Sequence, residues 1–413
     1  MTNKKIMEEV EELNACLIEI RRDIHAHPEH GFKEVRTSKK IINILSAYSN
    51  IELETGLVRG TGVIATIKGM QPGPTIMLRV DIDCVLAQDK KDVPYRSQTD
   101  GWCHCCGHDV HTTIGIGTAI LLSKMQEELH GTAKVFFQPS EDFPEIPPEY
   151  LPIDVYTEYP DFLRAGRIAV QDGLLNGVDR LLGMHCWPQL KVGTVGYDRW
   201  VAMSGNSNFH IAVLGKSGHA ATPHTTIDSI PIAAQLVLAL QTIVSRKVNP
   251  SMPLVLTIGT IKGGTRRSVI GERVDITGTV RGFDNTFLRN EVKDWMEAIT
   301  KGVCEANGAS YIFEYGVNQP SVINDETFTT EAVSALCDLI GKNNVIDLPD
   351  KPMTAEDFSF MSEVVPSLYL KLGTSNDDPK TQYALHNSCF DVDERCIAVG
   401  VAGAVKIISE YLK

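Results

Sequence analysis

Residues 111–138 contain the run His111-Thr-Thr-Ile-Gly-Ile-Gly-Thr-Ala-Ile-Leu-Leu-Ser-Lys-Met125, followed closely by Thr132-Ala-Lys-Val-Phe-Phe-Gln138. The first run is long and apolar and predicts a buried helix. The second is short and rich in β-branched and aromatic residues, which predicts a strand. A similar strand is predicted to end with Leu181-Leu-Gly-Met-His185. Strands that alternate with long helices favour an α/β fold, with a mainly parallel sheet flanked by helices on both faces.

The same alternation extends in both directions from this stretch. Apolar spacing and turn residues predict the following elements: helices over 4–25, 37–46, 327–342 and 392–412, and strands over 62–68, 75–81 and 367–372. Polar residues follow several of the strands, namely Asp81, Asp83, Gln138 to Asp142, and His185. Because ligands bind at the carboxyl ends of such strands, we expect these residues to lie at the functional site.

Residues 200–316 show a different order of elements. Strands over 208–215, 253–262, 273–281 and 310–315 and helices over 228–246 and 286–306 give the sequence βαββαβ, which is the ferredoxin-like plan. We therefore expect residues 200–316 to form an inserted domain. The outer domain would consist of residues 1–199 and 317–413.

Composition excludes several classes of protein. The 413 residues are 43% apolar and 22% charged, as in ordinary globular proteins, and the length predicts two or three domains. The net charge of −13 disfavours nucleic acid as a partner. No secretory signal is expected in Met1–Val10, and the most apolar stretch, 230–240, is shorter than a bilayer span. We expect a cytoplasmic protein without a membrane partner, whose ten cysteines stay reduced.

The strongest chemical signal is Cys103-His-Cys-Cys-Gly-His-Asp-Val-His111, placed just before a predicted helix. Thiolate and imidazole bind zinc, and the spacing of Cys106 and His108 allows both to reach one ion. The alternative is a set of hydrogen-bonded loop histidines. A zinc ribbon would need a second Cys-x-x-Cys pair, which the chain lacks. Any further ligands must therefore come from elsewhere in the chain.

Several residues near predicted strand ends are candidates for that role. Glu141 and Asp142 are adjacent carboxylates whose side chains diverge, so one could bind metal while the other holds water, although a solvated acidic turn is the alternative. His185 follows a buried strand, where an imidazole needs a partner. His386 precedes the final predicted helix and alone indicates little.

Seven motifs, in order along residues 20 to 400, carry a specific resemblance. They are Arg22-Asp-Ile-His-Ala-His-Pro-Glu29, Arg79-Val-Asp-Ile-Asp83, Cys106-Gly-His-Asp-Val-His111, Gln138-Pro-Ser-Glu-Asp142, Gly215-Lys-Ser-Gly-His-Ala-Ala-Thr-Pro-His224, Glu356-Asp-Phe-Ser359 and Leu385-His-Asn387. The chain resembles the amidohydrolase branch of the aminoacylase/carboxypeptidase zinc peptidases, which includes hippurate hydrolases and indoleacetyl-amino-acid hydrolases. This resemblance implies a two-metal hydrolase with an α/β catalytic domain and an inserted lid that forms a homodimer.

The resemblance also implies roles for individual residues. Cys106 matches the ligand that bridges the two metals, and His108, His185 and His386 match further ligands. Glu141 matches the general base, which would take a proton from a metal-activated water and pass it to the leaving nitrogen. The last ligand position holds Asp142 in place of the usual Glu, and the shorter arm is expected to weaken one metal site. Asp83 is expected beside the ligands, not among them.

Two lid residues have implied roles with open alternatives. His219, in the Gly-His-Ala-Ala motif, matches a histidine that reaches the partner subunit's site and helps to hold the oxyanion, but a structural role at the dimer interface is as plausible. Arg281 matches an arginine that pairs with a substrate carboxylate; a solvated strand-end arginine is the alternative.

Two departures from the family's pattern bear on substrate. Ser268-Val-Ile-Gly271 stands where the family commonly has Asn-Val-Ile-Pro. The acidic, proline- and tyrosine-rich stretch 143–162 resembles an insertion, and we expect it to cap the pocket and shape acyl specificity.

We therefore predict hydrolysis of N-acyl amino acids, with acetyl, benzoyl or similar acyl groups, to a carboxylic acid and a free amino acid. The expected cofactors are two divalent metals, with zinc favoured and manganese or cobalt as alternatives. Three other hypotheses stay open: a dipeptidase or carboxypeptidase using the same site, a catalytically weak metal-binding protein, and a thiol hydrolase built on Cys106.

Overall fold

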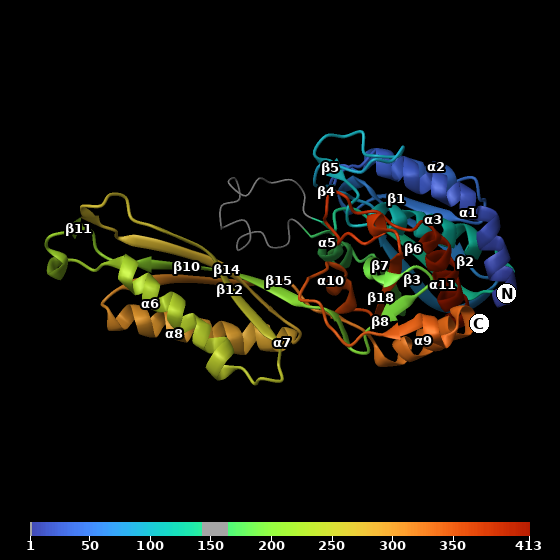
Figure 1. Ribbon diagram of the computed structural model, residues 1–413. Coiled ribbons are helices and arrows are strands. Elements are labelled where there is room, and N and C mark those ends of the chain that lie inside the picture. Colours follow the sequence, from blue (N-terminus) through green and yellow to red (C-terminus); the bar gives the residue numbers. More distant parts are fainter. Residues whose placement is uncertain (1, 143–163) are drawn as a thin grey trace.

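The computed structural model describes residues 2–142 and 164–413, which form two bodies around separate sheets (Figure 1). The predicted cap at 143–162 lies outside the described residues. The larger sheet has eight strands in the order β1-β2-β6-β3-β7-β18-β8-β17. Their bounds, in that order, are Glu52–Leu57, Gly62–Lys68, His130–Gln138, Gln71–Asp81, Arg180–Lys191, Ser367–Ser375, Val195–Tyr197 and Val345–Asp347.

The centre of this sheet is parallel, which confirms the predicted architecture. Strand β3 pairs in parallel with both β6 and β7, and β7 pairs in parallel with β18. The edge strand β1 and its neighbour β2 are antiparallel. Because the four central strands run the same way, their carboxyl ends meet at one edge of the sheet.

Helices cover both faces of the large sheet. One face packs against α1 (Asn3–Ala26), α2 (Val35–Leu45), α3 (His108–Lys124), α9 (Glu326–Ile340) and α11 (Arg395–Tyr411). The other face packs against α5 (Ala165–Gln171) and α10 (Phe358–Ser362). Along β3, Ile76, Leu78 and Val80 lie in the first core and Met77 in the second. Alternation places Arg79 and Asp81 on the side of α10.

Helix α3 begins at His108, three residues before the predicted start. The preceding residue, Gly107, has φ +91°, and a Cβ there would lie 2.8 Å from the Cys186 sulfur. Glycine adopts this left-handed conformation without steric cost and fits the narrow gap beside β7. As a result His108 and His111 occupy the first turn of a helix buried along nearly all its length.

The second body is a four-stranded antiparallel sheet with the order β12-β14-β10-β15. Helices α6 and α8 pack on it around the core residues Phe209, Ile211 and Val213. In chain order the elements are β10 (Gly205–Leu214), α6 (Ser229–Thr242), β12 (Leu254–Gly263), β14 (Arg273–Gly282), α8 (Lys293–Ala306) and β15 (Ser310–Gln319). This is the predicted βαββαβ plan, and we call this body the lid. The predicted domain boundaries at 199/200 and 316/317 stay predictions.

Short strands complete the fold. A pair formed by β11 (Gly218–His219) and β13 (Val269–Ile270) lies at the end of the lid farthest from the large sheet (Figure 1). Two further pairs, β4 (Val85–Leu86) with β5 (Trp102–Cys103) and β9 (Val201–Met203) with β16 (Val322–Ile323), flank the large sheet.

One segment, Ser229–Lys247, is long and apolar enough to cross a membrane by length and composition. It consists of α6 and a π-helical turn over Ile243–Lys247. Its buried side, which includes Ile232, Leu236 and Leu240, packs into the lid core. A core helix of a globular domain satisfies the same criterion, and packing in the lid core explains why these three positions are apolar.

Candidate metal centre

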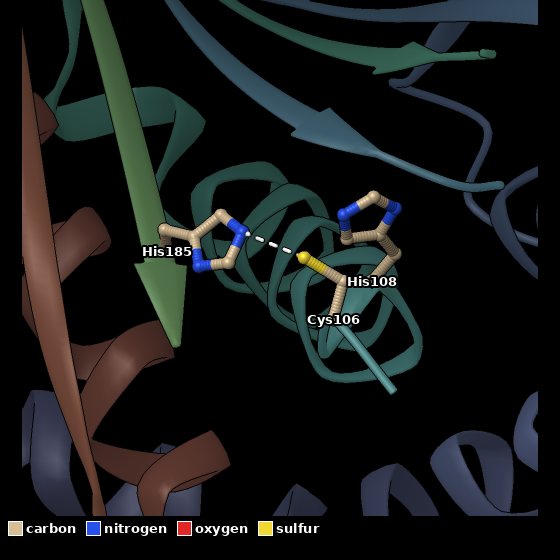
Figure 2. A group of neighbouring side chains, drawn as sticks. All are labelled: Cys106, His108 and His185. Atoms are coloured by element: carbon tan, nitrogen blue, oxygen red, sulfur yellow. Dashed lines mark hydrogen bonds between the residues drawn. The ribbon is translucent and has the colours of Figure 1, made fainter. Parts of the chain in front are cut away.

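The candidate site lies where the central strands end and α3 begins. Figure 2 shows the imidazole of His185 reaching from β7 towards the thiol of Cys106, with His108 beside Cys106 at the start of α3. The Cys106 Sγ atom lies 3.4 Å from Nε2 of His185. Potential ligand atoms of Cys106, His108 and His185 lie within 4.8 Å of one another, and all three residues are buried. This group could hold one metal ion.

A second group shares the same thiol. Nε2 of His386 lies 3.2 Å from Cys106 Sγ and 3.7 Å from Oδ2 of Asp142. The backbone N–H of His386 donates to the carbonyl of Cys105 at 2.7 Å, and His386 has φ +65°. This strained conformation holds the imidazole against the thiol, although the side chain is 53% exposed. Cys106 therefore belongs to both groups, as a bridging ligand would.

Hydrogen bonds to groups outside the ligand cluster orient the imidazoles of His108 and His185. Nδ1 of His185 lies 2.8 Å from the Cys186 carbonyl, and Nδ1 of His108 lies 3.0 Å from Oδ1 of Asp83. When the ring is neutral, Nδ1 therefore carries the proton in each case, and the Nε2 lone pair faces the cluster. Asp83 contacts the predicted ligand His108, and its supporting role stays a prediction.

The cluster contains buried polar atoms without a partner among the described residues. Nε2 of His108 and Oδ2 of Asp142 are both buried and lack a hydrogen bond, and they lie 3.8 Å apart. Such atoms cost free energy unless something satisfies them. A cation between an imidazole nitrogen and a carboxylate oxygen would satisfy both, so these residues fit a metal ion.

The charges of the cluster also favour cations. Burial, together with the carboxylates of Asp142 and Glu141, raises the pKa of the Cys106 thiol well above its usual value. Burial lowers the pKa of His108, but Asp81 and Asp83 outweigh this and raise it to about 10. Negative charge thus gathers around these groups. A thiolate at Cys106 would require divalent cations beside it.

Glu141 lies at the edge of the cluster. It is 7% exposed, and its Oε2 lies 3.9 Å from Nε2 of His108. Its Oε1 accepts a 3.4 Å hydrogen bond from the backbone N–H of Asp357. Burial and the neighbouring Glu356 raise the pKa of Glu141 well above its usual value. A carboxylate placed here could accept a proton from a bound water, and its role as general base stays a prediction.

His111 is close to the site but its ring nitrogens are already occupied. Nε2 accepts from the backbone N–H of Cys186 at 2.8 Å, so Nδ1 carries the proton and donates to Asp81 at 2.6 Å. His111 therefore supports the site and leaves metal binding to its neighbours. The sequence placed Asp81 at the functional site without a specific role, and it gave Arg79 no role.

The two lid candidates lie apart from this cluster within one chain. His219 is exposed on β11, at the far end of the lid from the large sheet (Figure 1), and its Nδ1 accepts from the backbone N–H of Ala221 at 3.0 Å. Ser268 adjoins the same strand pair, where its carbonyl accepts from Ala220. Arg281 is partly buried near the end of β14, and its Nη1 donates to the carbonyl of Met353 at 3.1 Å. The predicted roles of His219 and Arg281 stay predictions.

Comparison with known proteins agrees with this geometry. Residues 77–410 match the model of peptidase family M20/M25/M40. The chain is 37% identical over 324 residues to an N-acyl-L-amino acid amidohydrolase of Geobacillus stearothermophilus, covering 78% of this chain and 82% of the relative. It is 32% identical over 398 residues to thermostable carboxypeptidase 2 of Saccharolobus solfataricus, covering 96% and 95%.

A solved structure extends the comparison to the fold. The YXEP protein of Bacillus subtilis, described as a dinuclear metal-binding peptidase of the M20 family, superposes with a TM-score of 0.81 at 32% identity. The match covers 97% of this chain and 99% of that protein. The sequence match, the superposition and the shared-thiol cluster lead to one conclusion: the chain belongs to the M20 family of metal-dependent hydrolases.

Proposed function

We propose that this enzyme hydrolyses the amide bond of N-acyl amino acids and releases a carboxylic acid and a free amino acid. The observation that carries the proposal is the position of Cys106 between two groups of potential ligands, with Glu141 beside them. The Geobacillus relative at 37% identity, an N-acyl-L-amino acid amidohydrolase by name, supports the same substrate class.

The residues of the site have separate tasks in this proposal. Cys106, His108, Asp142, His185 and His386 would hold two divalent cations, of which zinc best suits thiolate and imidazole. When bound, these ions supply the charge that acidifies water and polarises the scissile carbonyl.

Glu141 would act on that water as a base. It would accept a proton at its carboxylate as the water oxygen bonds to the carbonyl carbon and the carbonyl electron pair moves onto oxygen. It would then deliver that proton to the amine nitrogen, and the carbon–nitrogen bond would break as the carbonyl re-forms. The free amino acid would leave with the proton that Glu141 had carried.

The nearest alternative is a carboxypeptidase or dipeptidase using the same residues. The Saccharolobus relative, named as a carboxypeptidase, favours this second candidate. A thiol hydrolase built on Cys106 agrees less well with the structure, because burial and nearby carboxylates disfavour a free thiolate. A catalytically weak metal-binding protein would retain the ligands but has no evident need for Glu141.

We further propose that the lid pairs with a second copy of the chain. Leu238 on α6 is 73% exposed, and Val255 and Ile261 on the edge strand β12 are also exposed. Apolar side chains on an open sheet edge favour burial against another chain. Sedimentation equilibrium should give a dimer, and Leu238→Lys should shift it towards the monomer. A monomeric wild type would contradict the proposal.

The main test combines metal analysis with a panel of N-acetyl amino acids, N-benzoyl amino acids and dipeptides. Wild type should bind about two metals per chain and prefer the acylated substrates. Glu141→Gln should keep the metals and lose at least about 100-fold in kcat. Glu54→Gln, which changes an exposed acid on β1, is the matched control. Full activity of Glu141→Gln would refute the mechanism, and preference for dipeptides would favour the alternative.

A further inference from the structure

A buried carboxylate, Asp357, lies in a cage of hydrogen-bond donors beneath the active site. Nη2 of Arg79 donates to its Oδ1 at 2.8 Å, and the amide of Gln138 lies 2.9 Å from both oxygens. The backbone N–H of Gly166 donates to Oδ2 at 2.8 Å. The side chains of Asp357, Arg79 and Gln138 are all buried. Three donor groups converge on this one buried carboxylate, so the position of Asp357 is closely determined.

The residue before it is held as firmly. Oε2 of Glu356 accepts from the hydroxyl of Tyr369 at 2.6 Å, and its Oε1 lies 3.1 Å from Nη2 of Arg79. Carboxylate oxygens of Glu141, Glu356 and Asp357 lie within 4.8 Å of one another. The Arg79 guanidinium already supplies a cation to Glu356 and Asp357, so this acidic group does not require a metal ion.

The fixed turn contacts Glu141 directly. The backbone N–H of Asp357 donates to Oε1 of Glu141, and it is the one donor to that carboxylate among the hydrogen bonds of the described residues. A glutamate side chain has several rotatable bonds, and its carboxylate is aimed only where a partner holds it. Gly166 packs so closely against the Asp357 carbonyl that a Cβ would collide with it, which leaves the turn little room to move.

The cage is also joined to the predicted metal ligands. Nη1 of Arg79 donates to Oδ2 of Asp81 at 2.7 Å, and the other oxygen of Asp81 accepts from His111. His111 in turn accepts from the backbone of Cys186, next to His185. The turn that holds Glu141 and the strand end that holds His185 therefore share one buried network.

We propose that Asp357 is a positioning residue for Glu141, and that Arg79 and Gln138 act through it. The inference rests on the proposed function, because it assigns Glu141 the role of base. Proton transfer requires the base within hydrogen-bond reach of the water, and a displacement of about 1 Å can cost about 100-fold in rate. Loss of the cage should therefore lower kcat while substrate binding and metal content persist.

Asp357→Asn tests the proposal with little change in shape. One oxygen becomes an NH₂ group that faces the donors of Gln138 or Gly166, so the turn must shift. We expect kcat to fall about 100-fold, with KM within about threefold of wild type and two metals retained. Asp198→Asn is the matched control, because Asp198 is an equally buried carboxylate paired with Lys371 at 2.7 Å and, among the described residues, has no hydrogen bond or ion pair with Glu141.

A double variant distinguishes positioning from general damage. Asp357→Asn combined with Gln138→Glu exchanges the carboxylate and the amide between the two positions. The new amide at position 357 then donates to an oxygen of the new carboxylate at position 138, and Arg79 keeps a negatively charged partner. One bond, from Gly166 or Arg79, is lost. We expect about a tenfold recovery of kcat relative to Asp357→Asn. If Asp357→Asn does not fold, Gln138→Met, which removes one donor, should lower kcat about tenfold.

Two results would overturn the proposal: kcat of Asp357→Asn within about threefold of wild type, or no recovery in a folded double variant. Inactive wild type across the panel would refute the proposed function instead. In that case, crystal structures of wild type and Asp357→Asn would test the positioning. An unchanged position of the Glu141 carboxylate in the variant would refute it.

Discussion

Replacing Arg79 by methionine should destabilise the fold far more than replacing a surface arginine. The Arg79 side chain is 1% exposed and has carboxylate oxygens of Asp81, Asp357 and Glu356 at 2.7, 2.8 and 3.1 Å. Methionine keeps most of the volume but leaves these carboxylates without their cation. Breaking a buried ion pair in this way costs about 3–5 kcal/mol of unfolding free energy.

Arg289 is the matched control. It pairs with Glu363 at 2.8 Å, but the two side chains are 44% and 31% exposed. Solvent screens such a pair, and Arg289→Met should cost no more than about 1 kcal/mol. Urea unfolding followed by circular dichroism measures both variants. Arg79→Lys, which keeps the charge but not the planar fork, should fall between them. Equal losses for Arg79→Met and Arg289→Met would refute the reasoning.

Three further results are expected. Cys106→Ala removes the thiol common to both ligand groups, so metal analysis should show loss of both ions, whereas retention of two would contradict a shared ligand. Asp142→Glu lengthens the arm of the last predicted ligand and should raise occupancy at the weaker site at limiting metal concentration; unchanged occupancy would show that Asp142 reaches far enough. Burial and the charge of Asp83 raise the pKa of Glu34 from 4.5 to about 8, so the folded protein keeps a proton there that the unfolded chain releases. The stability that this proton contributes is fully present below about pH 4.5 and is lost as pH rises to about 8. The loss of unfolding free energy is up to about 1.4 kcal/mol per pH unit. Measured as Tm against pH, the dependence should be flatter in Glu34→Gln than in wild type.

Most elements of the fold were predictable because hydrophobic periodicity reports which side of an element faces the core. Helix α1, strand β2 and the order of the lid elements agree with the sequence-based predictions. The predicted single helix over 286–306 is instead broken into α7 (Asn285–Phe287), a π-helical turn (Leu288–Val292) and α8. One extra residue in a turn leaves the apolar pattern nearly unchanged, so periodicity did not detect the break.

Cys106 and His108 are candidate ligands from their spacing, Asp142 and His185 from their places near strand ends, and His386 only through the resemblance. Their binding of metal stays a prediction. The supporting contacts were not predictable in this way. Arg79 and Asp357 both lie in motifs that carry the resemblance, but they are 278 positions apart and no local pattern links one to the other. His111 has the same local spacing as a ligand, and only the contacts of its two nitrogens show that it supports the site instead.

The amino-acid sequence by itself determined the α/β class, the βαββαβ lid and the residue types able to bind metal, because these depend on local periodicity and side-chain chemistry. The resemblance implied a bridging position for Cys106, but only the tertiary structure gave its distances to the two ligand groups and the contact between Asp357 and Glu141. Those relations depend on parallel strands ending at one edge and on side-chain alternation that directs Arg79, Asp81 and Tyr369 to the face of α10. The site depends on contacts between residues that are far apart in the chain, and local sequence does not encode those contacts.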